Sequence, residues 1–185
     1  MRPSSPPDHT RTIDMPDGSI TKQQSNPQGP GYDWRNKGIR HVSAADRSCD
    51  TPETLGMNRE VAISGSRTGS THLWAGTNRI EPGSQTGPHH HGELESIIYI
   101  ISGTAHMRWG DRLEFITEAK AGDFFQVPPY VPHQEINAST TEVLHCALVR
   151  SGVEEVVVNL PDIEVAETPE WVNVSSAAMP GKKPV

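Results

Sequence analysis

The sequence predicts an all-β fold, a sandwich or a barrel, on three observations. From about residue 61 the chain contains short runs rich in Ile, Val, Phe, Trp, Tyr and Thr, which are the residues that strands favour. Gly, Pro, Asn or Asp separates these runs, and the whole chain has 16 Gly and 16 Pro. No stretch shows a helical period of useful length. The predicted strands lie within residues 59–64, 72–80, 95–110, 113–119, 122–129, 141–151 and 154–161.

The two ends of the chain are predicted to lie outside the strand-rich region. Residues 1–40 are rich in Pro, Ser, Gly, Asp and Gln and lack apolar periodicity, so we expect a flexible or extended arm. Residues 166–185 end in SSAAMPGKKPV and are predicted to form a C-terminal tail.

Two β-hairpins are predicted inside the strand-rich region. The run IISGTAHMRW would turn at Ser102-Gly103, and the run WGDRLEF would turn at Gly110-Asp111.

Charge and cysteine usage limit the partners and the compartment. The net charge of −7 argues against a nucleic-acid partner, which requires a basic face, and no apolar run is as long as a membrane helix. The start of the chain has no apolar core typical of a secretory signal, and Cys49 and Cys146 cannot form a disulfide framework. We therefore expect a protein of the reducing cytoplasm, with no nucleic-acid or membrane partner.

Three consecutive histidines stand in the segment GSQTGPHHHGELES, residues 83–96. Alternate residues of a strand share a face, so His89 and His91 point one way and His90 the other. Glu95 begins the next apolar run and can face the same interior, whereas Glu93 follows Gly92 in a turn and is expected in solvent. Two imidazoles and a carboxylate would then converge and leave positions for other ligands.

A fourth candidate ligand, His133, lies about forty residues further along the chain in AGDFFQVPPYVPHQEIN. Pro128, Pro129 and Pro132 fix φ at three nearby positions, so this loop can hold a ligand still.

The first histidine segment resembles the first motif of the cupin superfamily. Gly83 is followed by five residues, His89, one residue, His91, three residues and Glu95. The motif usually has a glycine about six residues after the glutamate, and Gly103 comes slightly later than that.

The second segment resembles the second cupin motif. Gly122 is followed by five residues and Pro128, and His133 is followed by three residues and Asn137. Tyr130 stands where the family commonly has Gly, a difference that changes how the turn is made.

The resemblance implies a small single-domain, metal-binding cupin: an antiparallel jelly-roll β-barrel over residues 41–165. It also implies one divalent transition metal per chain, bound by His89, His91, Glu95 and His133. Three neutral imidazoles and one carboxylate suit first-row metals and leave one or two coordination positions open. Iron is the metal that we expect, with manganese, nickel, copper or zinc as alternatives.

Strand alternation after Glu95 extends the expected site. Ile97, Tyr99 and Ile101 share the face of Glu95, so they would line the interior, and the Tyr99 hydroxyl becomes a candidate catalytic group. The opposite face would be apolar and would have to be covered, which favours a homodimer. That face would carry Ser96, Ile98 and Ile100.

The function expected from these features is metal chemistry on a small organic substrate. A metal-dependent oxidoreductase of the dioxygenase type is favoured, because the ligand set leaves positions for both substrate and oxygen. A non-redox isomerase, lyase or decarboxylase and a non-catalytic small-ligand binder remain as alternatives, since one fold hosts many functions.

Overall fold

The computed structural model describes residues 11–14, 20–23, 29, 31–50 and 57–174. By its contacts the chain divides into two units, Met1–Arg40 and His41–Val185. In the first unit, β1 (Arg11–Asp14) pairs with β2 (Ile20–Gln23), and the helical turn α1 (Trp34–Lys37) follows. The side chain of Asp33 begins α1 by accepting a hydrogen bond from the backbone of Asn36.

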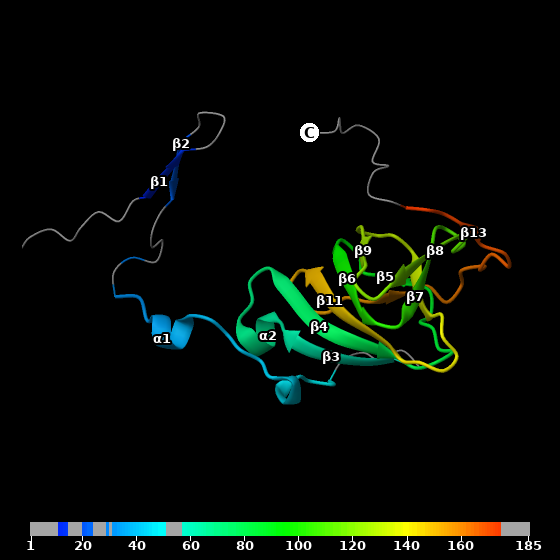
Figure 1. The fold of residues 1–185 in the computed structure, drawn as a ribbon, viewed down its shortest axis with the longest axis horizontal. Helices are drawn as coiled ribbons and strands as arrows, with labels where there is room; N and C mark the ends of the chain where they lie inside the picture. The colour runs from blue at the N-terminus through cyan, green and yellow to red at the C-terminus, as the bar shows by residue number, and fades with distance from the viewer. Residues whose placement is uncertain (1–10, 15–19, 24–28, 30, 51–56, 175–185) are drawn as a thin grey trace, which may run out of the picture. The chain divides into compact units, whose positions relative to one another are not determined.

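The second unit is a pair of β-sheets, and the all-β prediction is confirmed (Figure 1). Helical segments among the described residues of this unit are the short η1 (Ala44–Asp46) and α2 (Gly65–Thr68). The five-stranded sheet has the order β3 (Met57–Ile63), β4 (Leu73–Ile80), β11 (Leu144–Ser151), β6 (Ser96–Ser102) and β9 (Phe124–Val127). The six-stranded sheet has the order β12 (Val158–Asn159), β5 (His89–His90), β10 (His133–Asn137), β7 (Thr104–Trp109), β8 (Phe115–Lys120) and β13 (Glu170–Trp171).

Strands far apart in the sequence lie side by side in these sheets. The orange β11 runs between the green strands β4 and β6, and it pairs antiparallel with both (Figure 1). The pairs between the strands described in this unit are antiparallel except β13 with β8, which is parallel. None of the helices in the described segments is long and apolar enough to cross a membrane.

Strand β6 turns the opposite face inward from the one that the sequence predicts. Ile98 and Ile100 are buried in the core between the sheets, with Ile100 completely inaccessible. Ile97, Tyr99 and Ile101 are instead 46%, 37% and 41% exposed on the outer face. The prediction was wrong because it placed Glu95 on the inward face of the histidines. Residues 92–95 are not a strand, so the alternation at the histidines does not continue to Glu95.

One of the two predicted hairpins is confirmed and the other is wrong. Strands β7 and β8 pair in register from Thr104 with Lys120 to Trp109 with Phe115. Strands β6 and β7 do not pair with each other, because the chain passes from one sheet to the other at Gly103. This glycine has a φ of 90°, and a Cβ there would lie 3.1 Å from the backbone of Leu144. A turn signal therefore marks a sheet crossing here.

Candidate metal centre

Three histidines converge between the sheets. His89 lies on β5, directly opposite His133, the first residue of β10, and His91 follows β5 on the same face as His89. All three side chains are buried, and their ring centroids lie 4.3–5.0 Å apart. One nitrogen from each ring can be chosen so that the three lie within 4.8 Å of one another. His90 is half-buried, and its Nδ1 accepts a hydrogen bond from the backbone of Gly92.

The Nδ1 atom of each of the three rings is hydrogen-bonded to a backbone carbonyl oxygen. His89 Nδ1 lies 2.9 Å from the oxygen of Gly87, and His133 Nδ1 lies 2.9 Å from that of Val131. His91 Nδ1 lies 2.8 Å from the carbonyl oxygen of Val156. Because a carbonyl accepts, each Nδ1 carries the proton and each Nε2 keeps its lone pair. The Nε2 of His133 is buried without a hydrogen-bond partner, which is costly unless something else occupies that lone pair.

Burial also keeps the three rings neutral. It lowers the pKa of His91 to about 2, with the charge of Arg150 as the next cause. It lowers the pKa of His133 to about 4, with His89 as the next cause, and burial likewise lowers the pKa of His89. A metal binds the neutral imidazole, so this donor set is suited to a divalent first-row ion at neutral pH.

These shifts predict how the metal-free protein responds to acid. The folded histidines have pKa values below the ordinary value of 6.5, so the unfolded chain takes up protons that the folded chain does not. Their contribution to stability is complete above about pH 6.5 and is lost as the pH falls, down to about 4 for His133 and about 2 for His91, at up to about 1.4 kcal/mol per pH unit for each histidine. Urea unfolding between pH 7.5 and 4.5 measures this slope. His91→Gln should make it shallower and His90→Ala should not, and equal slopes in all three proteins would contradict the burial of the cluster.

Glu95 does not join the histidines, contrary to the expected ligand set. Its side chain is exposed, and its carboxylate accepts a hydrogen bond from Gln126. The buried residue on the inner face is Ser96, the first residue of β6. Six residues separate Ser96 from Gly103, so the glycine that comes late when counted from Glu95 is in place when counted from Ser96. That offset was the sequence signal for the correct alignment.

Tyr99, the expected catalytic residue, also lies away from the histidines. It is on the outer face of the five-stranded sheet, where its ring packs on that of Phe124 at 4.7 Å. The reversed face of β6 explains both misplacements.

Arg150 is a site residue that the sequence prediction missed. It lies on β11, it is 3% exposed, and its guanidinium lies over the ring of Trp74. Its Nε donates to Ser96 Oγ at 3.0 Å, and its Nη2 donates to His91 Nε2 at 3.0 Å. Arg150 continues the buried alternate face formed by residues 144, 146 and 148, so extending that alternation by one more step would have found it.

Tyr130 takes the conformation that suits the glycine usual in the family. Its φ is 61°, and its side chain is exposed with the ring 6.0 Å from that of His90. The backbone of Tyr130 donates to Gly92, which ties the two histidine-bearing segments together.

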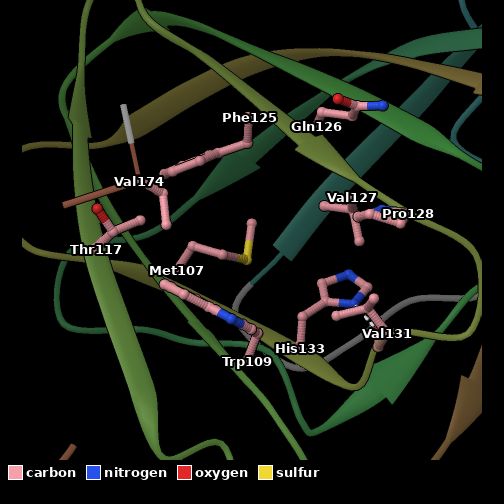
Figure 2. A pocket seen from close by; sticks show the side chains of 10 residues that line it. All are labelled: Met107, Trp109, Thr117, Phe125, Gln126, Val127, Pro128, Val131, His133 and Val174. Atoms are coloured by element: carbon pink, nitrogen blue, oxygen red, sulfur yellow. Dashed lines mark hydrogen bonds between the residues drawn. The ribbon is translucent and has the colours of Figure 1, made fainter. Parts of the chain in front are cut away.

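A cavity of about 280 Å³ reaches the cluster at His133. Figure 2 shows the imidazole of His133 at one wall of the cavity, with Trp109 and Met107 beside it and Phe125 on the opposite side. The cavity can hold a small organic molecule next to the histidines, in mostly apolar surroundings. Its lining residues are Met107, Trp109, Thr117, Phe125, Gln126, Val127, Pro128, Val131, His133 and Val174.

The fold and the histidine cluster together match a known class of protein. Residues 76–163 match the family model of the cupin domain. The resemblance to the cupin superfamily that the sequence predicts is therefore confirmed. The cupin domain with its three-histidine cluster supports a cupin-type metalloprotein.

Solved cupin structures share the fold at low sequence identity. Oxalate decarboxylase from Bacillus subtilis is 23% identical over 58% of this chain and 28% of its own, with a TM-score of 0.51. The polyketide cyclase RemF from Streptomyces resistomycificus is 18% identical over 68% of this chain and 89% of its own, with a TM-score of 0.55. This chain thus spans less than a third of the oxalate decarboxylase chain. None of the curated protein sequences matches it.

Proposed function

We propose that this chain is a metal-dependent enzyme that acts on a small organic molecule. His89, His91 and His133 hold one divalent first-row metal through their Nε2 atoms, and the substrate occupies the cavity beside His133. The observation that carries the proposal is the arrangement of the three rings: each Nδ1 is tied to a carbonyl, and the buried Nε2 of His133 has no hydrogen-bond partner.

The reaction that we propose is a dioxygenase-type oxidation with iron(II). Three protein nitrogens leave more open positions than a four-ligand set, so a metal held there would have room for both a substrate and oxygen. When bound, iron would supply the redox chemistry with oxygen, while the chain's own residues orient the substrate and keep water away from it. Manganese is the first alternative, because the similar oxalate decarboxylase of Bacillus subtilis has Mn(II) centres; that chain is 23% identical over 59% of this one and 29% of its own, with a TM-score of 0.51.

Metal loading followed by oxygen-uptake measurements tests this proposal. Metal-free protein is loaded with Fe(II), Mn(II) or Zn(II) and mixed with a panel of small organic acids, ketones and phenols. Oxygen uptake by the iron form, absent from His133→Ala, supports the oxidation. Turnover by the zinc form without oxygen would replace it with the non-redox alternative. Failure to bind any divalent metal would overturn the whole proposal.

We propose further that two copies of the chain associate through the outer face of the five-stranded sheet. The apolar face predicted at Ile98 and Ile100 is in the core, and the exposed apolar residues stand on the other side of β6. Ile97 pairs with Val149 and Tyr99 with Phe124, so these four side chains form one patch over three neighbouring strands. A continuous apolar patch of this kind is typical of a protein interface.

The variant Phe124→Glu is expected to convert the proposed dimer to a monomer, because it places a charge in the apolar patch. Sedimentation velocity measures the change. Val165→Glu is the matched control, since Val165 is also an exposed apolar residue but lies outside the patch. A monomeric wild-type chain, or a Phe124→Glu variant as dimeric as the control, would contradict this interface.

A further inference from the structure

We propose that Arg150 is the anion-binding residue of the metal centre and that the site takes a carboxylate, whose apolar body occupies the cavity beside His133. The inference rests on the proposed metal site and names the class of substrate. It follows from the hydrogen bonds of Arg150, the charges around it and the lining of the cavity.

The guanidinium of Arg150 has more donors than acceptors around it. Nε donates to Ser96 Oγ and Nη2 donates to His91 Nε2, each at 3.0 Å. Nη1 is buried without a hydrogen-bond partner, and the nearest carboxylate oxygen in an ion pair with it, from Glu155, lies 4.0 Å away. A buried N–H without an acceptor is costly, so the site favours a ligand that can accept from it.

Metal binding at His91 would release a second donor of Arg150. His91 Nδ1 carries its proton, because it is bonded to the carbonyl of Val156, so Nε2 has the single lone pair of the ring. A metal and the Nη2 hydrogen of Arg150 therefore compete for the same lone pair. With a metal bound, Nη1 and Nη2 both lack acceptors, and a fork of two N–H groups matches the geometry of a carboxylate.

The charge balance points in the same direction. Two arginines, Arg59 and Arg150, and two glutamates, Glu135 and Glu155, are buried or nearly buried near the site, so their charges balance. Glu155 is already paired with Arg59. Three neutral imidazoles add no negative charge, and Ser96 stands where an acidic ligand was expected. A divalent metal would thus bring two uncompensated positive charges into a buried site, which is unfavourable without an anion.

The cavity determines the rest of the ligand. His133 is both a member of the cluster and part of the cavity wall, so a ligand bound at the cluster can extend into the cavity past this residue. Met107, Trp109 and Phe125 line the space and favour an apolar or aromatic body. A small arylalkanoic or branched alkanoic acid combines the two requirements.

The test uses Co(II)-loaded full-length protein with 3-phenylpropionate and its uncharged amide as probes. We expect the carboxylate to perturb the visible spectrum of cobalt and to bind about 10- to 100-fold more tightly than the amide, as for a hydrogen-bonded charged pair. The carboxylate should also tighten cobalt binding in the wild type, and the amide should not. This second measurement needs no variant.

Arg150→Gln should remove the preference for the carboxylate while binding cobalt at least as tightly as the wild type, because the competitor for His91 is gone. Arg79→Gln, an exposed arginine on the neighbouring strand β4, is the matched control and should change neither property. A wild type that binds cobalt but shows no preference for the carboxylate overturns this inference alone, and so does an Arg150→Gln variant that keeps the preference. A wild type that binds no cobalt overturns the metal site itself.

Discussion

Replacing His133 with alanine is expected to abolish metal binding at physiological metal concentrations. His133 is 1% exposed and is the one ring contributed by the second cupin motif, so no neighbouring side chain can replace its Nε2. Loss of a mere hydrogen-bond partner of a metal-binding histidine costs about 10- to 100-fold in affinity, and loss of the ligand itself should cost at least about 100-fold. Competition between the protein and a chromophoric chelator for Zn(II) or Co(II) measures the difference.

Two variants serve as controls for this measurement. His90→Ala and Glu95→Gln change residues beside the ligands, but His90 faces away from the cluster and Glu95 is exposed. Both should bind metal within about threefold of the wild type, which is the scale of ordinary surface substitutions. Near-normal binding by His133→Ala, or a loss in His90→Ala as large as that in His133→Ala, would contradict the register of β5 and β10. Circular dichroism of each metal-free variant establishes that the fold is retained.

Ile100→Ala is expected to lower the free energy of unfolding by about 2–5 kcal/mol, as truncation of a buried isoleucine does. Ile100 is completely inaccessible and lies in the core between the sheets with Trp74, Leu144 and Leu148. The loss of buried apolar area and the cavity left behind both contribute to the effect. Urea unfolding followed by tryptophan fluorescence measures the change.

The neighbouring Ile101→Ala is the matched control, since it removes the same atoms from a side chain that is 41% exposed. Its effect should stay below about 1 kcal/mol, because much of the area that it removes is already exposed and no closed cavity is left behind. Unfolding at several protein concentrations separates a change in the core from a change in the proposed dimer. A larger effect for Ile101→Ala than for Ile100→Ala would contradict this arrangement of β6 and favour the sequence prediction, in which Ile101 faces the interior.

Strands with their own apolar pattern were predictable from the sequence. The runs at 72–80 and 141–151 contain β4 and β11, and the run at 113–119 covers β8 except its last residue, because each run is rich in residues that favour strands. Strand β10 was predicted as a loop, since prolines precede it and its residues HQEIN carry one apolar side chain. The crossing at Gly103 was predicted as a hairpin, because a glycine turn has the same local signal whether the chain stays in one sheet or changes sheets.

Strand alternation predicted that His89 and His91 share a face, but it placed Ser96 on the wrong face of β6. Alternation continues from β5 to His91, so His89 and His91 are buried and His90 between them is only half-buried. It does not hold across residues 92–95, which are not a strand, and this is why the prediction places Glu95 inside and Ser96 outside. The cavity depends on how two sheets pack against each other, and no local pattern contains that information.

X-ray absorption spectroscopy of the metal-loaded protein tests the central claim most directly. The structure leads us to expect one metal per chain with three imidazole nitrogens and no carboxylate from Glu95, and therefore an unchanged spectrum in Glu95→Gln. Fewer than three imidazoles, an oxygen ligand lost in Glu95→Gln, or the absence of stoichiometric metal would contradict the account.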